Sequence, residues 1–311
     1  MFRQFVAHRQ WAALRSRAHE LGLGIIGDVP IFVAIDSADV WANPDLFQLD
    51  AELHPTVVAG VPPDYFSETG QLWGNPLYDW DRHAANGYAW WIERIAAIHD
   101  QVDLIRIDHF RGFVDYWEIP AGAATAVTGR WVDGPGEALF DALEGALGSL
   151  PIIAEDLGEL HDTVPALRDH LRLPGMKILQ FAFDGDPDND FLPEHYPTHC
   201  VVYTGTHDNE TVRGWYRNLD RHERARVREY LGTSGRSIPW DMISEAWESR
   251  AALAVTPMQD VLGLDNEARM NTPSTTGGNW QWRMRPGAAT AALARRMDDL
   301  NRRTGRHRVE A

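Results

Sequence analysis

Three acidic residues each stand at the downstream end of a short apolar run, and this arrangement limits what the chain can fold into. The runs end at Asp108, Glu155 and Asp208. A run of about four to eight aliphatic residues bounded by Gly or Pro is too short for a helix and is typical of a buried parallel strand. If such strands close into a barrel, carboxylates at their C-terminal ends converge on one mouth of that barrel.

The composition is that of an ordinary globular protein, and it restricts the partners. The chain has 311 residues, is 44% hydrophobic and carries a net charge of -16. Nucleic acid and anionic membranes are therefore not expected partners, because phosphate groups need a basic surface. No run approaches the roughly 18 apolar residues that span a bilayer, and the first residues lack the features of a signal peptide. With Cys200 as its single cysteine, a cytoplasmic protein with a neutral ligand is expected.

The chain contains 13 tryptophans, where about four would be expected at ordinary usage. Aromatic rings offer a flat apolar surface on which the apolar face of a pyranose can stack. Most of these rings are expected in the core. Trp73, Trp80 and Trp280 are the ones expected near a ligand, because they lie in segments rich in Gly and Pro.

Short apolar runs alternate with helical patterns along the chain. Strands are expected at 25–33, 102–108, 151–155, 176–183 and 200–205, with a weaker one at 267–271. Helices are expected at 2–21, 87–99, 136–147, 162–171, 220–231, 241–254 and 288–303. A long loop region, rich in Pro, Gly and Asp, is expected over about 36–81.

This alternation predicts an α/β fold with a parallel sheet, specifically a (β/α)8 TIM barrel. One catalytic domain is expected over 1–311, with an inserted loop region at about 36–81 and a helical insertion at about 212–260. Only six strands are found, and the chain opens with a helix that should follow a strand. The first two barrel strands are therefore expected to precede Met1, in a longer enzyme of which this chain is an N-terminally truncated form.

The three strand ends suggest glycoside chemistry. Side chains two apart on a strand point the same way, so Arg106 is expected to hold Asp108 ionised, as a nucleophile requires. Glu155 follows an apolar run, which raises a carboxyl pKa and suits a general acid. Asp208 would be a third carboxylate that stabilises developing positive charge. The sequence alone does not choose Glu155 over Asp156, and the alternative for each acidic residue is a cap on a strand or helix.

Several segments then resemble one family. Four segments are similar to the signature regions of the amylomaltases, which are the 4-α-glucanotransferases of glycoside hydrolase family 77. They are Gly27–Ala34, Arg106–Gly112, Ala154–Gly158 and Thr204–Asn209. Gly60–Gly74 resembles the mobile loop over that family's active site, and Asn271–Arg283 resembles its C-terminal signature. The resemblance covers essentially the whole chain.

The resemblance implies a role for each matching residue. It implies Asp108 as nucleophile, Glu155 as acid/base and Asp208 as transition-state stabiliser, with no cofactor. The residues that it implies for substrate binding are Asp28, Asp64, Tyr65, Phe66, Gln71, Trp73, Arg106, His109, His207 and Asn279. The implied partners are malto-oligosaccharides or other α-1,4-glucans derived from starch or glycogen.

Alternatives to this interpretation are a metal site and a different reaction at the same carboxylates. No spacing among the 13 histidines resembles a zinc site. The acidic segment Asp184–Asp190 lacks the Gly and Glu that a calcium loop needs, so it is interpreted as a turn. Besides a transferase, the residues allow an α-amylase-type hydrolase, in which water takes the glucosyl group. They also allow an inactive fragment that binds maltodextrin.

Overall fold

The computed structural model describes residues 1–63, 67–158, 161–275 and 277–306. These residues form two compact units, Met1–Gly175 (unit 1) and Met176–Ala311 (unit 2). The predicted α/β character is confirmed, because strands and helices alternate through both units. Asp64, Tyr65 and Phe66 lie outside the described residues.

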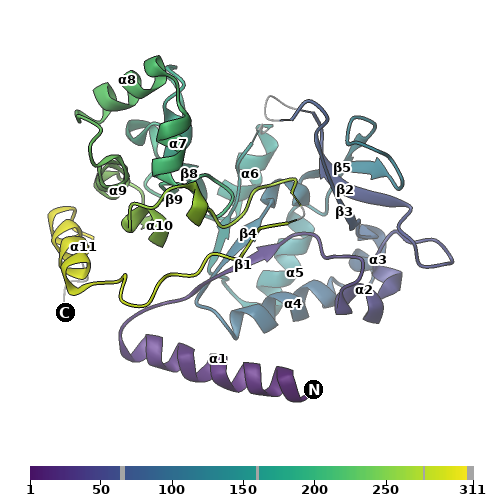
Figure 1. Ribbon diagram of the computed structural model, residues 1–311. Helices are drawn as coiled ribbons and strands as arrows, with labels where there is room; N and C mark the ends of the chain where they lie inside the picture. The colour runs from purple at the N-terminus through teal and green to yellow at the C-terminus, as the bar shows by residue number, and fades with distance from the viewer. Residues whose placement is uncertain (64–66, 159–160, 276, 307–311) are drawn as a thin grey trace. The chain divides into compact units, whose positions relative to one another are not determined.

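Unit 1 is built on a three-stranded parallel sheet with the order β1-β4-β7. Figure 1 labels β1 and β4 of this sheet. Its strands are β1 (Ile26–Pro30), β4 (Leu104–Asp108) and β7 (Ile152–Ala154). The register places Asp28 opposite Arg106 and Pro30 opposite Asp108. Ile105 and Ile107 of the central strand are almost completely buried, which explains the apolar residues on either side of Arg106.

Helices cover this sheet and close the core of unit 1. They are α4 (Ala89–His99), α5 (Glu137–Leu147) and α6 (Thr163–His170), whereas α1 (Phe2–Glu20) contains no buried residue. The helix α4 packs against α5 and β4, and both helices bury the apolar side chains that recur every three to four residues. The helix α1 is held to the turn before β4, where Trp11 Nε1 donates to the Gln101 carbonyl (2.9 Å) and Arg15 pairs with Asp103 (2.7 Å).

A second sheet of unit 1 takes two of its strands from the region expected to be a long loop, which is therefore only partly a loop. It has four antiparallel strands in the order β3-β2-β5-β6. They are β2 (Val57–Val61), β3 (Gln71–Pro76), β5 (Asp115–Pro120) and β6 (Arg130–Asp133). The helices of this region are α2 (Ala38–Ala42) and α3 (Trp80–Ala85). Gly60 allows β2 and β3 to approach, because a Cβ there would lie 2.2 Å from the Gln71 carbonyl oxygen.

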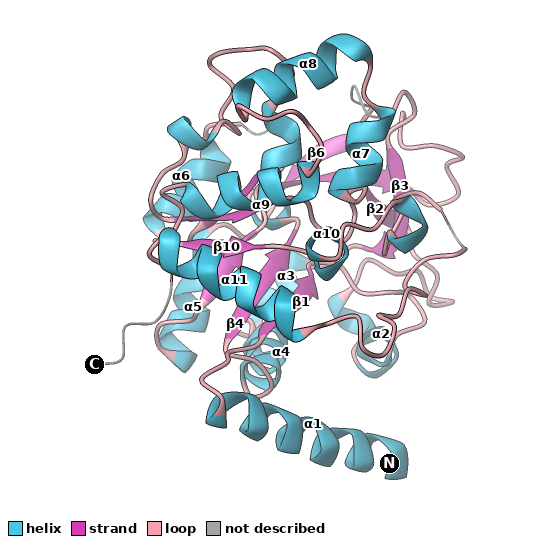
Figure 2. Cartoon of the chain, turned by 60° about the vertical axis from the view of Figure 1, so that its left-hand side comes forward, coloured by secondary structure: helices cyan, strands magenta, loops and turns pink. Residues whose placement is uncertain are grey.

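Unit 2 contains a three-stranded sheet with the order β8-β9-β10, of which β9 and β10 are parallel. The strands are β8 (Gly175–Ile178), β9 (Cys200–Tyr203) and β10 (Leu253–Val255). The helices are α7 (Val212–Asn218), α8 (Arg221–Tyr230), α9 (Ile238–Glu248), α10 (Met258–Val261) and α11 (Ala291–Arg303). Figure 2 shows α9 beside α11, against which it packs.

Short 3-10 helices complete the described fold. They are η1 (Pro44–Leu46), η2 (Phe110–Phe113), η3 (Leu179–Ala182), η4 (Pro193–His195) and η5 (Asn266–Ala268). Among the described residues, no helix combines the length and the apolar character needed to cross a membrane.

Most predicted elements are confirmed within a few residues, but three in unit 2 are wrong in part. The predicted helix over 241–254 ends at Glu248, and Leu253–Val255 is the strand β10 instead. The predicted strand at 267–271 is absent from the described structure, where η5 occupies Asn266–Ala268. The predicted strand at 176–183 stops at Ile178, where η3 begins one residue later.

Candidate active site

Arg106 is the centre of a charged cluster at the carboxyl end of the parallel sheet. Its guanidinium lies on β4 and is buried (6% exposed). Nη1 contacts Oδ1 of Asp28 at 2.6 Å, and Nη2 contacts Oδ1 of Asp108 at 2.9 Å. Burial acts to lower the pKa of Arg106, but the carboxylates of Asp108, Asp28 and Glu155 outweigh it and raise that pKa. The arginine therefore stays charged and fixes two carboxylates from adjacent strands.

Glu155 follows β7 directly and joins this cluster. Its Oε2 accepts from the backbone N–H of His109 (2.6 Å), and its Oε1 accepts from that of Leu157 (3.0 Å). Burial raises the pKa of the Glu155 carboxyl, and the nearby charge of Asp108 raises it further. Arg106 and the two backbone donors oppose this change without cancelling it. A carboxyl group in such surroundings can remain protonated near neutral pH and donate that proton.

The neighbouring Asp156 has different partners, so the structure distinguishes the two acidic residues that the sequence could not separate. Asp156 is buried and pairs with Arg168 of α6. Gly175 packs against it, because a Cβ there would meet the Asp156 carboxylate at 2.4 Å. Of the two residues, Glu155 is the one that lies beside Arg106 and Asp108.

His109 and Trp73 bring the antiparallel sheet to the same place in unit 1. His109 has a left-handed backbone (φ 55°), and its ring meets the Trp73 ring edge-on at 4.9 Å. Burial lowers the pKa of His109 to about 4, so the imidazole is neutral at pH 7. Trp73 is 38% exposed, and its Nε1 donates to Oε1 of Gln71 (3.2 Å). Trp73 of β3 therefore contacts His109 directly, and Gln71 of the same strand is bonded to Trp73.

Asp208 lies in unit 2, on the segment that follows β9. Its Oδ1 accepts from Nδ2 of Asn271 (2.5 Å), and its backbone carbonyl accepts from Arg269 (2.5 Å). His207 Nε2 lies 3.3 Å from the other carboxylate oxygen of Asp208. The His207 ring also packs against the Trp280 ring, with 5.1 Å between their centroids. The structure thus brings Asp208 together with His207 in this unit.

Asn279 is held within its own loop. Its side-chain oxygen accepts from the backbone N–H of Thr272 (3.0 Å), and its amide donates to the Thr275 carbonyl (3.1 Å). Neighbouring Trp280 is 52% exposed. Trp80, which was expected near a ligand, instead packs on Tyr78 (4.9 Å) and belongs to the aromatic core.

Asn271 and Arg269 are not predicted from the sequence as partners of Asp208. They stand more than sixty positions away along the chain, and no local pattern encodes such a contact. The only signal is that Asn271 begins the segment that resembles the C-terminal signature. Within the described part of the chain, no group of three or more His, Cys, Asp or Glu side chains is arranged to hold a metal ion.

Comparison with known proteins decides the family. Residues 1–290 match the profile of glycoside hydrolase family 77, described as 4-alpha-glucanotransferase. The chain belongs to this family. It is 55% identical over 294 residues to the 4-alpha-glucanotransferase of Thermus thermophilus, covering 92% of this chain and 59% of that protein. It is 46% identical to the 4-alpha-glucanotransferase of Clostridium butyricum, covering 98% of this chain and 63% of that protein.

The same relationship holds at the level of structure. An amylomaltase from Streptococcus agalactiae, solved in complex with acarbose, superposes with a TM-score of 0.94 at 40% identity. That match covers 97% of this chain and 61% of the amylomaltase. The chain therefore spans about three-fifths of the length of these family members, and the predicted resemblance to family 77 is confirmed.

Proposed function

We propose that this protein is a 4-α-glucanotransferase that moves α-1,4-glucan segments between malto-oligosaccharides by a retaining double displacement. The observation that carries the proposal is the cluster of Asp28, Arg106, Asp108 and Glu155 at the carboxyl end of the parallel sheet. It pairs a carboxylate fixed by a guanidinium with a second carboxyl whose pKa is raised. A retaining mechanism needs this combination of a nucleophile and an acid.

In the first step, an oxygen of Asp108 attacks the anomeric carbon of the glucan. Glu155 gives its proton to the glycosidic oxygen as the bond to the leaving chain breaks. In the second step, Glu155 takes the proton from the 4-hydroxyl of an acceptor sugar, which displaces Asp108 from the anomeric carbon. Two inversions give net retention. Asp208 stabilises the positive charge that develops on the ring in both transition states.

The remaining site residues bind the glucan in this proposal. His109, Trp73 and Gln71 contact the sugar beside Glu155, since they lie together in unit 1. Asp28 contacts it from beside Arg106, and His207 contacts it from beside Asp208. Asp64, Tyr65, Phe66 and Asn279 are the further binding residues that we propose from the family resemblance.

For the whole protein, we propose the (β/α)8 barrel of α-amylase type. In this proposal β1, β4, β7, β8, β9 and β10 are strands of that barrel. The segments at about 36–81 and 212–260 would be insertions within one catalytic domain. The proposed substrates are α-1,4-glucans derived from starch or glycogen, and the proposed location is the cytoplasm.

The test is the distribution of products from maltotriose. A transferase yields glucose together with chains longer than maltotriose, because the acceptor is another sugar. A hydrolase yields only shorter chains, and that result would replace the proposal with the α-amylase-type alternative. Binding of maltotriose without any product from the 311-residue chain would support the inactive maltodextrin-binding fragment instead. When Glu155 is replaced by Gln, the matched control is Glu144→Gln, which removes the same charge at an exposed position of α5.

A further inference from the structure

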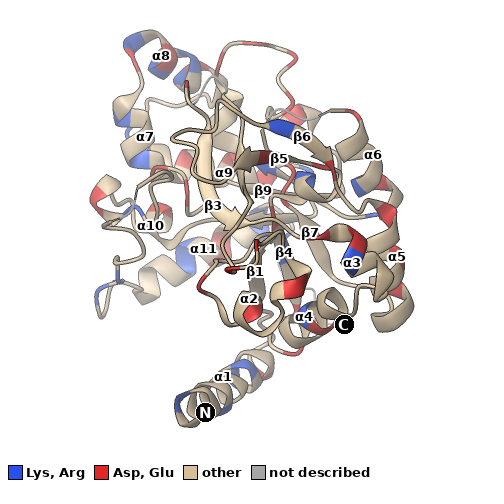
Figure 3. Ribbon diagram, turned by 90° about the vertical axis from the view of Figure 1, so that its right-hand side faces the viewer, with Lys and Arg blue, Asp and Glu red and all other residues tan. Residues whose placement is uncertain are grey.

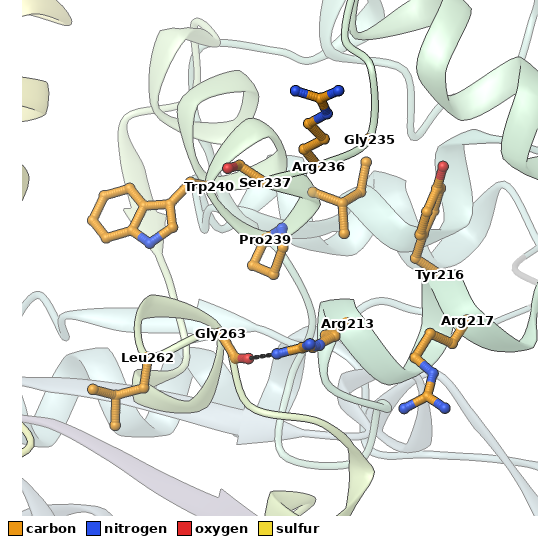
Figure 4. Close-up of a pocket in the computed structure, with 11 residues that line it drawn as sticks. Arg213, Tyr216, Arg217, Gly235, Arg236, Ser237, Pro239, Trp240, Leu262 and Gly263 are labelled. Atoms are coloured by element: carbon orange, nitrogen blue, oxygen red, sulfur yellow. Dashed lines mark hydrogen bonds between the residues drawn. The ribbon is translucent and has the colours of Figure 1, made fainter.

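Unit 2 contains a pocket of about 500 Å³ that is separate from the segment carrying Asp208. Its walls come from α7, from the segment Gly235–Ser237, from the first turn of α9 and from Leu262 and Gly263 (Figure 4). This volume lies within the range of about 300–1,000 Å³ that is usual for sites that bind small molecules.

The charge of this pocket is opposite to that of the chain. Arg213, Arg217 and Arg236 line it, and no acidic side chain is among the described residues that do so. The whole chain has 45 acidic residues against 29 basic ones. In Figure 3 the ribbon of α7 and α8 carries blue segments, which mark the positions of Lys and Arg. A local group of three guanidinium groups therefore stands out from an acidic background, and it favours an anionic ligand.

The three arginines are only partly occupied by protein partners. Arg213 donates to the Gly263 carbonyl (2.9 Å) and Arg217 pairs with Asp265. Arg236 makes no hydrogen bond or ion pair with the described residues. Arg213 and Arg217 stand four positions apart on one helix, where like charges repel. Asp265 offsets part of this repulsion, because its charge acts on both arginines. Arg236 and Arg213 are therefore the guanidinium groups available to an anion.

The remaining walls are suited to a ring attached to that anion. Tyr216, Pro239 and Trp240 line the pocket (Figure 4). Trp240 is fixed by its Nε1 hydrogen bond to the Val261 carbonyl (3.2 Å) and by Arg296, which covers its ring at 3.7 Å. Gly235 leaves room for Tyr216, because a Cβ there would lie 2.7 Å from the Tyr216 hydroxyl.

We propose that this pocket binds a phosphate monoester. Guanidinium groups match phosphate oxygens in pairs of parallel hydrogen bonds, and the tyrosine and proline surfaces offer contact to a sugar ring. A neutral glucan would leave Arg213 and Arg236 without complementary charge, since only Arg217 has an acidic partner. The volume of about 500 Å³ suits a small metabolite whose phosphate is attached to a sugar or nucleoside.

The experiment is isothermal titration calorimetry on the full chain, at low and constant ionic strength. The three probes are glucose 1-phosphate, AMP and inorganic phosphate. Saturable binding of an ester, more tightly than inorganic phosphate, is the expected result. Comparison of glucose 1-phosphate with AMP identifies the attached group. Absence of binding by both esters at millimolar concentration overturns the proposal, as does an ester affinity no greater than that of inorganic phosphate.

Paired variants locate the binding. Arg213→Gln combined with Arg236→Gln should weaken ester binding at least about tenfold, since each lost charge-assisted hydrogen bond contributes substantially. The combination of Arg221→Gln with Arg295→Gln changes the net charge equally on exposed positions of α8 and α11. It should leave the affinity unchanged. Equal weakening in both pairs would show nonspecific attraction and contradict the proposal.

Two further measurements keep the test decisive. If the double variant at Arg213 and Arg236 does not fold, Arg236→Gln alone is used, because Arg236 makes no bond to the described residues. It should still weaken the ester several-fold, and an unchanged affinity would reject the site. Titration of glucose 1-phosphate in saturating maltotriose should leave its affinity unaltered. Loss of binding under that condition would place the ester in the glucan site and overturn the proposal.

Discussion

The adjacent residues Glu155 and Asp156 both follow the same strand, but their carboxyl groups have different charged neighbours. Glu155 lies beside Asp108 and Arg106, and burial together with the Asp108 charge raises its pKa. Asp156 is neutralised by Arg168 in the interior. In the proposed mechanism the first residue exchanges protons with the substrate, whereas the second stabilises the fold.

The two positions therefore predict different defects. Glu155→Gln should lower kcat by about 10²–10⁴-fold, the usual contribution of a general acid and base, while the protein stays folded. Asp156→Asn should instead reduce the free energy of unfolding by about 1–3 kcal/mol, because Arg168 loses a buried partner. Glucose release from maltotriose and thermal unfolding measure the two effects. A Glu155→Gln variant with nearly normal turnover would contradict the assignment.

For single residues, the local sequence pattern predicts some side-chain contacts and not others. The pairing of Arg106 with Asp108 is predictable, because side chains two apart on a strand share a face. The contact of Arg106 with Asp28 depends on the register between two strands that lie 78 residues apart. The bond from Asn271 to Asp208 depends on a loop that folds back over 63 positions. A short segment of sequence predicts neither the register between two strands nor the path of a long loop.

Among the elements, the short helix α10 fixes the segment that carries Asp208. Its Asp260 is buried and accepts a hydrogen bond at each end of that segment. Thr204 donates its hydroxyl to Oδ2 (2.8 Å), and the backbone N–H of Val212 donates to Oδ1 (2.8 Å). One carboxylate therefore holds both ends of the stretch that places His207 and Asp208.

Removing this carboxylate should misplace Asp208 without touching the substrate. Asp260→Ala is expected to lower kcat by between about ten- and a hundredfold, the typical effect of a displacement near 1 Å in an active site. Asp260→Asn should recover most of the activity, because its amide can still accept from Val212. Steady-state kinetics at a temperature where all variants are folded checks this. Equal activity of the alanine variant and the parent would show that the segment holds its position unaided.

The elements that the sequence does not predict are those set by tertiary pairing. Leu253–Val255 continues a helical pattern, yet it pairs with β9 as β10, because burial beside a strand overrides weak local preference. The sheet of β2, β3, β5 and β6 joins segments on both sides of α4, and its short strands contain Gly and Pro. By contrast, α5 and α8 have strong helical periodicity, and the structure places them where expected.

Across the whole molecule, two buried groups give stability opposite dependences on pH. Burial lowers the pKa of His83 in unit 1 to about 4, against an ordinary value of 6.5. Its contribution is present above pH 6.5 and is lost as the pH falls through 4. Burial raises the pKa of Asp260 in unit 2 from 3.8 to about 6. Its contribution is present below pH 3.8 and is lost as the pH rises through 6.

These opposing contributions act over nearly the same pH window, and each amounts to roughly 3 kcal/mol because one pKa unit is about 1.4 kcal/mol. His83→Phe should make the thermal midpoint fall more steeply as the pH rises from 4 to 6.5, because the Asp260 contribution is then unopposed. In Asp260→Asn the thermal midpoint should instead rise over this pH range, because the His83 contribution is then unopposed. His99→Gln and Asp299→Asn, both exposed, are the matched controls and should follow the parent. Thermal unfolding at constant ionic strength measures the slopes, and parallel curves for all five proteins would show that neither buried group controls acid stability.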